Sequence, residues 1–250
     1  MNIIIVNDAA SIRGGADRVA FDSAAGLVSL GHRVTLFTGF GPIDPALEAI
    51  PGMTVHCLGT GWLKQEQTSP AAVVRGMWNF EAARRLREVL AGYNPAETVV
   101  HFHLYAAGLT SSVLHAATAA GFPTILTLHD YFITCPNGAY FVFPQAQLCE
   151  RRALSWSCFA CHCDSRKQVH KYWRFARTWI QGRLARIPER ITAYAAVSET
   201  CAALARRDLP KSARIEVVPN IVAVKRGVPV DVAKNKALVF TGRLENYKGP

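Results

Sequence analysis

Short apolar runs alternate with stretches of helical spacing along most of this chain. The first run, Ile3–Val6, is unbroken, as expected of a strand that is buried on both faces of a parallel sheet. Apolar residues then recur at helical spacing over residues 16–28, and a second strand is predicted over 34–37. This opening βαβ unit predicts that the polar loop of residues 7–15 lies at the carboxyl end of the first strand, where open α/β sheets bind their ligands.

The same alternation continues to residue 220. It predicts further strands over 53–58, 98–103, 124–128, 191–197 and 215–218, and helices over 71–90, 107–120 and 165–188. Ser198, followed by Glu199, has the pattern of a helix N-cap. Residues 1–220 are therefore predicted to form one α/β domain with a doubly wound parallel, Rossmann-like sheet.

The last thirty residues do not continue the alternation of strands and helices. Residues 221–235 form a predicted linker, and a fresh strand is predicted over 237–241. A strand and its loop have almost nothing to bury against, so residues 236–250 are expected to be the first strand and loop of an incomplete second domain.

Two glycines, Gly14 and Gly15, close the polar loop directly before the first predicted helix. Glycine lets the backbone come close to a ligand and a helix N-terminus favours an anion, so the pattern predicts a loop that faces phosphate groups. A tight turn without a ligand is the alternative, because glycine pairs are common in turns. A dinucleotide site is not expected, since the G-x-G-x-x-G spacing is missing and residues 38–41 contain no carboxylate.

Three histidines lie near the ends of predicted strands. His129 follows the fifth strand and, in a parallel sheet, shares an edge with the glycine pair, which suits contact with a ligand. Alternatively, His129 only caps nearby backbone groups or pairs with Asp130. His101 and His103 point to one face of their strand, and we interpret them as satisfied edge histidines.

Residues 131–165 interrupt the alternation with a loop-like, cysteine-rich insertion. Cys158 and Cys161 have the C-x2-C spacing of a zinc knuckle, and Cys135 and Cys149 could complete a four-thiolate site. Such a zinc site would be structural, because four thiolates leave no open position for a substrate. Unbound reduced thiols and redox chemistry are the alternatives.

Composition narrows the class of protein. Half of the residues are hydrophobic, which is ample for a folded core. No apolar run reaches 18 residues, and the chain enters a strand without a basic leader. Neither a membrane span nor a secretory signal is therefore expected, and a cytoplasmic, reducing setting is predicted.

The net charge of +10 is concentrated in one segment. Residues 151–190 hold ten Lys and Arg side chains against two acids, Asp164 and Glu189. This excess favours anionic partners, namely phosphates, acidic lipid headgroups or nucleic acid. The predicted helix over 165–188 also mixes aromatic rings with its basic residues, which suits a peripheral membrane contact. A solvated helix with its rings packed on the sheet is the alternative.

Five short motifs, taken in order, resemble the amino-terminal half of the family 4 glycosyltransferases, which are retaining enzymes with the two-domain GT-B fold. The motifs span nearly the whole chain: Gly14-Gly15, Leu128-His129-Asp130, Val197-Ser198-Glu199, Val218-Pro219-Asn220, and Gly242-Arg243-Leu244 with Lys248-Gly249. The resemblance implies an acceptor-side domain followed by the beginning of a donor-binding domain. The cysteine-bearing segment is similar to one seen in a subset of the family.

The resemblance also implies roles for individual residues. In the family, the glycine loop lies against the donor's phosphates and the acceptor, and an Arg and a Lys grip the diphosphate leaving group, on which negative charge builds in the transition state. Donor and phosphate binding would thus fall to Gly14, Gly15, Ser198, Asn220, Arg243 and Lys248. His129 would contact the transferred sugar as the catalytic residue, and the chemistry would require no cofactor.

The family carries two glutamates seven residues apart in its second domain, and this sequence ends before that region, so we expect a truncated chain that is inactive alone. The predicted function is transfer of a hexose-type sugar, with retention, from a nucleotide sugar to a glycan or a lipid-linked acceptor. The setting would be the cytoplasm or the inner face of a membrane. The alternative is a basic module that binds a membrane or nucleic acid and carries a structural metal; for a transferase, nucleic acid is not an expected partner.

Overall fold

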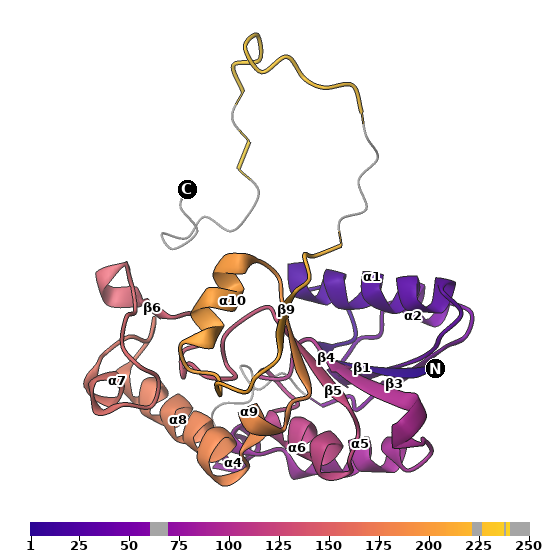
Figure 1. The fold of residues 1–250 in the computed structure, drawn as a ribbon, viewed down its shortest axis with the longest axis horizontal. Coiled ribbons are helices and arrows are strands. Elements are labelled where there is room, and N and C mark those ends of the chain that lie inside the picture. The colour runs from indigo at the N-terminus through magenta and orange to yellow at the C-terminus, as the bar shows by residue number, and fades with distance from the viewer. Residues whose placement is uncertain (61–69, 222–226, 238, 241–250) are drawn as a thin grey trace.

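A computed structural model of the protein describes residues 1–60, 70–221, 227–237 and 239–240. Seven parallel strands form its main sheet: β1 (Asn2–Ala9), β2 (Arg33–Phe40), β3 (Met53–Cys57), β4 (Thr98–Phe102), β5 (Thr124–Leu128), β8 (Ala193–Ala196) and β9 (Ile215–Val217). Their order is β3-β2-β1-β4-β5-β8-β9 (Figure 1). The chain therefore winds outward in both directions from β1 and β4, which confirms the predicted doubly wound, Rossmann-like sheet.

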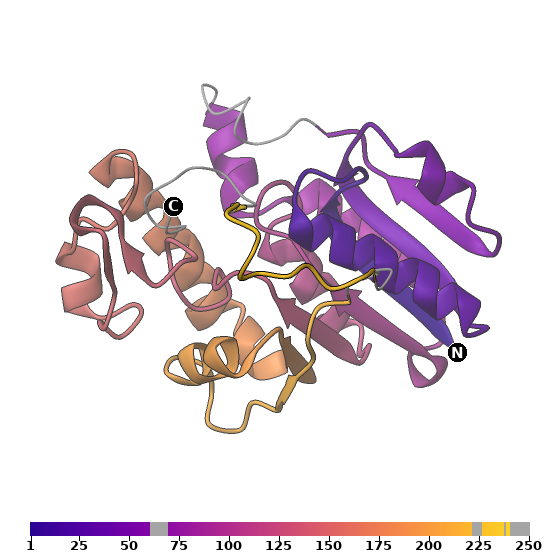
Figure 2. The same cartoon turned by 90° about the horizontal axis from the view of Figure 1, so that it is seen from above.

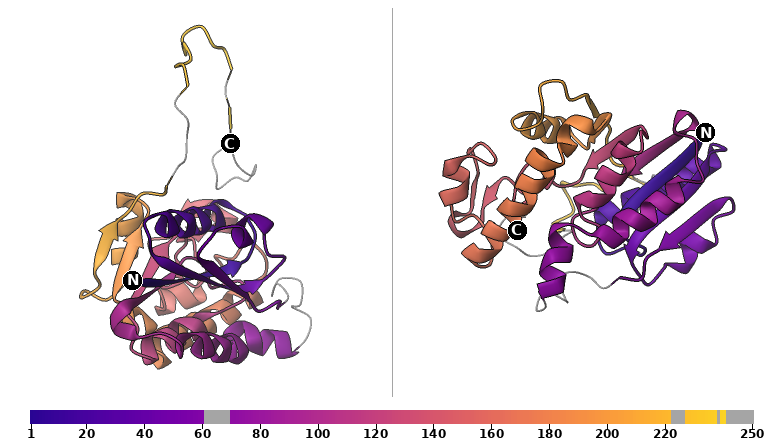
Figure 3. Two further views of the ribbon diagram at one scale, coloured as in Figure 1. Left: turned by 90° about the vertical axis from the view of Figure 1, so that its right-hand side faces the viewer. Right: turned by 90° about the horizontal axis from the view of Figure 1, so that it is seen from below.

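Helices cover both faces of this sheet. Those in the described residues are α1 (Gly15–Ser29), α2 (Pro45–Glu48), α4 (Pro70–Met77), α5 (Phe80–Leu90), α6 (Ser111–Ala119), α7 (Trp156–Ala160), α8 (Gln168–Trp179), α9 (Ile187–Arg190) and α10 (Glu199–Arg206), with short 3₁₀ turns at Pro95–Glu97 and Phe143–Gln145. α1 crosses one face of the sheet, and α5, α6 and α9 lie on the opposite face (Figures 1 and 3). The sheet is thus the middle layer of three.

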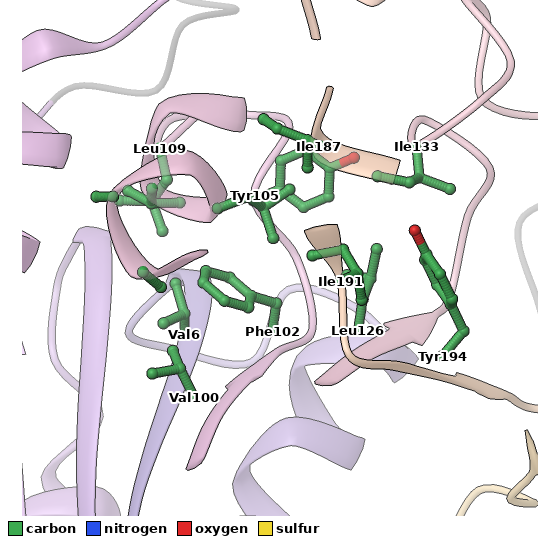
Figure 4. Packing of buried hydrophobic residues seen from close by; sticks show 14 of the residues in the cluster. Val6, Val100, Phe102, Tyr105, Leu109, Leu126, Ile133, Ile187, Ile191 and Tyr194 are labelled. Carbon is green, nitrogen blue, oxygen red and sulfur yellow. The ribbon is translucent and has the colours of Figure 1, made fainter. Parts of the chain in front are cut away.

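Two apolar clusters hold these layers together, one on each face of the sheet. Alternate residues of β1 supply both clusters, since Ile4 and Val6 enter the larger one and Ile3 and Ile5 the smaller. In the larger cluster Val6 packs beside the ring of Phe102 (Figure 4). Burial on both faces explains why the first apolar run is unbroken.

All seven strands predicted within residues 1–220 are present, and β5 has the predicted bounds. β1 is longer than its apolar run and continues to Ala9. Asn7 and Asp8 therefore belong to the strand and not to the polar loop that the pattern predicts. Both side chains are buried near the carboxyl end of β1.

The single helix predicted over 71–90 is wrong, because two helices, α4 and α5, occupy this segment. The break lies at Asn79, which caps α5: its side-chain oxygen accepts the Ala82 backbone N–H at 3.0 Å. The side-chain amide of Asn79 also donates to the Gly108 carbonyl (2.8 Å), and its backbone N–H donates to the Thr110 hydroxyl (2.9 Å). These buried contacts tie the break to the loop after β4.

The basic helix predicted over 165–188 is also interrupted. A π-helical turn, Ile180–Leu184, follows α8 and precedes α9. Gln181 lies inside this turn, where its buried side-chain amide donates to the carbonyls of Phe132 (3.1 Å) and Ile133 (2.7 Å). The interruption therefore occurs where the helix contacts the segment that follows β5.

The cysteine-rich insertion is folded and not loop-like as predicted. It contains a two-stranded hairpin, β6 (Phe141–Val142) and β7 (Gln147–Leu148), and the helix α7. Asp208, just after α10, ties the insertion to the domain, because its carboxylate accepts the Tyr140 hydroxyl (2.8 Å) and the Ala153 backbone N–H (3.0 Å). Figure 2 shows the insertion beside α8 at one end of the molecule.

The described residues beyond 226 are all exposed. Residues 237, 239 and 240, the described part of the strand predicted over 237–241, are not in a strand. Arg243 and Lys248 lie outside the described residues. In the part of the chain that the structure describes, no helix has the length and apolar content needed to cross a bilayer.

The break at Asn79 gives a test of the fold. Asn79→Ala is expected to lower the free energy of unfolding by about 2–3 kcal/mol, since it removes an N-cap and leaves the buried Gly108 carbonyl without its donor. Asn94→Ala is the matched control, because Asn94 makes the same kind of cap on an exposed turn and should cost at most about 1 kcal/mol. Urea unfolding measures both; equal losses would contradict a role for the buried contacts.

Candidate functional site

The carboxyl ends of the central strands bring polar residues together. β1 carries Asn7 and Asp8 near its end, His103 follows β4, and His129 and Asp130 follow β5. Because β1, β4 and β5 are parallel neighbours, these residues and the glycine loop after β1 share one edge of the sheet. The predicted common edge of the glycine pair and His129 is therefore confirmed.

Asp17, in the first turn of α1, fixes the loop that holds Gly14 and Gly15. Its buried carboxylate accepts the side-chain amide of Asn7 (2.9 Å) and the backbone N–H of Arg13 (3.1 Å). Gly14 has an extended backbone with φ −167°, and a Cβ added to either glycine would meet no atom within 4 Å. Neither the turn nor the packing requires glycine here, so the tight-turn alternative loses its physical reason.

Three histidines form a row across the ends of β4 and β5. The Nδ1 atom of His103 lies 3.0 Å from Nε2 of His129, and the two rings stack with centroids 5.3 Å apart. His101 continues the row, with its ring centroid 4.3 Å from that of His103 and its Nε2 atom 2.7 Å from the Thr127 hydroxyl. Among the described residues, buried Nε2 of His103 has no hydrogen-bond partner. The interpretation as a satisfied edge histidine holds for His101 and is wrong for His103.

Burial keeps this histidine row uncharged near neutral pH. It lowers the pKa of His101 and of His129 to about 4 and holds the pKa of His103 well below the ordinary value of 6.5. In a neutral pair only one ring donates the shared hydrogen. If His103 Nδ1 is the donor, the proton of His129 is on its own Nδ1, where it can be donated to a ligand hydroxyl.

Asp8 organises the loop after β4. Its buried carboxylate accepts three backbone N–H groups, from Ala107 (2.7 Å), Gly108 (2.9 Å) and Leu109 (2.9 Å). For this reason α6 begins at Ser111 and not at residue 107 as the sequence predicted. Burial raises the pKa of Asp8, and the three hydrogen bonds oppose that rise.

Arg177 brings a buried positive charge from α8 to this edge of the sheet. Its guanidinium donates to the Ala106 carbonyl (2.9 Å) and lies 5.2 Å from the ring centroids of Phe132 and Trp173. Burial raises the pKa of Asp130 to about 6, against the backbone hydrogen bond from Phe132 and the charge of Arg177. One cation of the basic segment is therefore part of the candidate site and not of the surface.

Ser198 and Asn220 follow β8 and β9 at the same edge. The Ser198 hydroxyl accepts the Cys201 backbone N–H at 3.1 Å, which confirms the predicted N-cap of α10. Asn220 is exposed. The donor-binding role of these two residues, and of Arg243 and Lys248 outside the described ranges, stays a prediction.

The cysteine-rich insertion holds a buried ammonium group among its thiols. Lys171 is fully buried, and its Nζ atom donates to the carbonyls of Cys158 (2.6 Å) and Cys161 (3.1 Å). The same Nζ atom lies 3.3 Å from the sulfur of Cys163. A second cation of the basic segment is therefore interior.

The four cysteines of the predicted zinc site, Cys135, Cys149, Cys158 and Cys161, are not grouped as metal ligands in the part of the chain that the structure describes. All the cysteines are free, and burial raises the pKa of the Cys135 thiol to about 11 and also raises that of Cys158. Across residues 1–60, 70–221, 227–237 and 239–240, no three His, Cys, Asp or Glu side chains are grouped so that they could hold a metal ion. Zinc stays a prediction, and the alternative of reduced thiols agrees with the described geometry.

Sequence reasoning did not single out Asp8, His103 or Arg177 as site residues. The two-residue spacing of His101 and His103 was a usable signal, since it places both on one face of β4. Asp8 could have been noticed only by extending β1 beyond its apolar run. Nothing in the pattern distinguishes Arg177 from the other basic residues of its segment.

Among solved structures, UGT2 and TcCGT1 share this fold, and MurG is less similar. Apo UGT2 of Phytolacca americana gives a TM-score of 0.52 at 12% identity, over 89% of this chain and 52% of that one. TcCGT1 in complex with UDP gives a TM-score of 0.50 at 11% identity, over 93% of this chain and 54% of that one. MurG of Acinetobacter baumannii gives a TM-score of 0.43 at 10% identity, over 88% of this chain and 46% of that one. This chain spans about half the length of the structures it matches. The similarity to UGT2 and TcCGT1 agrees with a Rossmann-like domain of the GT-B fold.

The sequence comparison identifies the family. Residues 13–226 match the family described as Glycosyltransferase Family 4, and the chain belongs to it. The match includes the glycine pair, His129, Ser198 and Asn220. A comparison with curated protein sequences found no match.

The uncharged histidines predict how stability depends on pH. Between about pH 6.5 and 4 the unfolded chain binds protons at His101 and His129 that the folded chain does not bind, so the free energy of unfolding falls as the pH is lowered. Asp130 acts in the opposite direction below about pH 6, because its raised pKa lets the folded state bind a proton first. His129→Gln should therefore lose less stability on acidification than the wild type, and Asp130→Asn should lose more.

Urea unfolding at about pH 7 and about pH 5 measures these differences. His162→Gln, a change at an exposed histidine, is the control and should follow the wild type. If His129→Gln and the wild type lost the same stability, the imidazole of His129 would not be held uncharged by the fold.

Proposed function

We propose that this chain supplies the acceptor-side domain of a retaining glycosyltransferase, which moves a hexose-type sugar from a nucleotide sugar to a glycan or lipid-linked acceptor. The shared edge of the sheet is the observation that carries the proposal, because the open Gly14-Gly15 loop and the neutral imidazole of His129 both lie there. A fold similar to TcCGT1, which was solved in complex with UDP, supports a nucleoside diphosphate as leaving group. The reaction would take place in the cytoplasm, at the inner face of the membrane for a lipid-linked acceptor.

Each residue has a role that its chemistry suits. The backbone at Gly14 and Gly15 approaches the donor's phosphates at the N-terminus of α1, where the helix dipole favours negative charge. His129, being neutral, hydrogen-bonds a hydroxyl of the transferred sugar, and His103 acts as its positioning residue through the contact at 3.0 Å.

The leaving group needs positive charge, which the histidine row does not supply near neutral pH. Departure of a nucleoside diphosphate builds negative charge on oxygen, and fixed cations stabilise that charge most in the transition state. In this proposal Arg243 and Lys248 hold the diphosphate, and Ser198 and Asn220 line the donor side. The chemistry requires no metal or other cofactor.

The glycine loop provides a test that separates binding from folding. Gly15→Ala should leave the free energy of unfolding unchanged or raise it by up to about 1 kcal/mol, since alanine is the better helix former. It should also weaken binding of UDP or GDP at least about tenfold, because the added Cβ enters the space that a phosphate would use. Gly26→Ala is the matched control, as Gly26 lies in the same helix and is equally open.

Isothermal titration and urea unfolding give the two readouts for both variants. Gly26→Ala is expected to gain similar stability and to keep its affinity for the nucleotide. Equal affinity in Gly15→Ala and Gly26→Ala would contradict a phosphate role for the loop.

Activity of the isolated chain is a further test. The 250 residues alone should release no nucleoside diphosphate above background in a coupled assay with common nucleotide sugars, because the family's paired glutamates lie in a second domain. Robust turnover would show that the second domain is not needed for activity, and it would leave the proposal of a transferase unchanged. For the alternative, a basic binding module, association would fall with salt and would not respond to UDP or GDP.

A further inference from the structure

Five aromatic side chains of α7 and α8 form an exposed cluster, which we name the aromatic face. Trp156 is 86% exposed, and the ring of Phe159 contacts it edge-on, with centroids 6.1 Å apart. Phe159 also contacts the rings of Tyr172 (5.0 Å) and Phe175 (5.2 Å) on α8. Trp179, one turn after Phe175 and 44% exposed, continues the same side of α8. Four of the five rings are therefore linked by ring contacts, and four of the five are exposed, Phe175 being half-buried.

α4 extends the apolar surface beside this face. The indole N–H of Trp173 on α8 donates to the Val73 carbonyl of α4 at 3.4 Å, so the two helices are neighbours. Val73 and Val74 are both exposed on α4, and Val169 is exposed on α8. Exposed apolar side chains gathered on neighbouring helices mark an interaction site more often than a chance feature.

The charges around the aromatic face are positive. Neither α7 nor α8 contains an acidic residue, and Asp164, which lies between them in sequence, is buried and paired with Arg174 at 2.9 Å. Exposed cations stand at both ends of the ring stripe, with Lys167 just before α8 and Arg183 one turn beyond Trp179. Rings flanked by exposed cations complement a surface that is apolar within and anionic outside.

A solvated helix and a nucleic-acid surface each agree with fewer of these observations. In a solvated helix the rings would pack on the domain. Trp173 does so, since it lies against Arg177, but Trp156 and Trp179 are exposed. A single-stranded nucleic acid needs separate ring faces on which bases can stack. Here Phe159 touches three neighbouring rings, and valines are exposed on α8 and on the neighbouring α4, so the surface suits acyl chains better than bases.

We propose that the aromatic face docks this protein on an anionic phospholipid bilayer, with its rings at the level of the headgroups and Lys167 and Arg183 against the lipid phosphates. Docking goes beyond the proposed transfer reaction, since it requires no nucleotide sugar. It would also set the distance of the candidate site from the membrane, because α8 carries Arg177 to the edge of the sheet that holds Asp8 and Asp130.

Vesicle co-sedimentation of the 250-residue chain tests the proposal. Vesicles of phosphatidylcholine mixed with phosphatidylglycerol should bind the wild type, and binding should weaken with added salt. The double variant Trp156→Ala/Trp179→Ala should lower the partition constant at least about tenfold on these vesicles. Lys167→Glu/Arg183→Glu should lower it by about fivefold or more for each residue, with little effect on pure phosphatidylcholine.

Matched controls come from exposed residues elsewhere in the chain. Phe80→Ala removes a ring that is 69% exposed on α5, and Arg33→Glu/Lys211→Glu reverses two exposed charges away from α7 and α8. Both should change the partition constant by less than about twofold. Thermal melts followed by circular dichroism show that each variant is folded.

Three results would overturn the proposal. They are the absence of wild-type binding to anionic vesicles, equal losses in the aromatic-face and control variants, and preferential binding of an oligonucleotide that displaces the vesicles. Titration with UDP or GDP in parallel distinguishes failure of docking from failure of the proposed transfer function, because the two readouts use different residues.

Discussion

The edge of this sheet depends on one buried carboxylate. Burying an ionised carboxyl group is costly unless hydrogen bonds and a counter-charge compensate it, and Asp8 has both: three backbone N–H groups of residues 107–109 and the nearby guanidinium of Arg177. The carboxylate thereby connects β1 to the start of α6 and to α8. The side-chain amide of the neighbouring Asn7 donates to Asp17, whose carboxylate also accepts a backbone N–H of the glycine loop. The glycine loop, His103 and His129 are each one or two contacts from this strand.

The sequence predicted the sheet well because its strands are buried on both faces. Runs such as Ile3–Val6 leave a pattern that needs no tertiary information, and β5 was predicted to the residue. The N-cap at Ser198 was equally local, since donor and acceptor lie three residues apart.

The failed predictions share a different cause, namely partners that are distant in sequence. The break at Asn79 is held by Gly108, and the π-helical turn is held by contacts between Gln181 and the segment after β5. The role of His103 depends on a contact with His129, twenty-six residues away. No window of ten or fifteen residues contains both members of these pairs, so periodicity could not reveal them.

The contacts of Asp8 also have a consequence for co-translational folding. Its three N–H donors lie 99 to 101 residues downstream, and Arg177 is synthesised later still. Until residue 109 has left the exit tunnel, a nascent chain holds this carboxylate without its partners. Contacts between such distant positions form late and slowly, so a partly synthesised chain exposes the ends of β1 for capture by chaperones or by other chains.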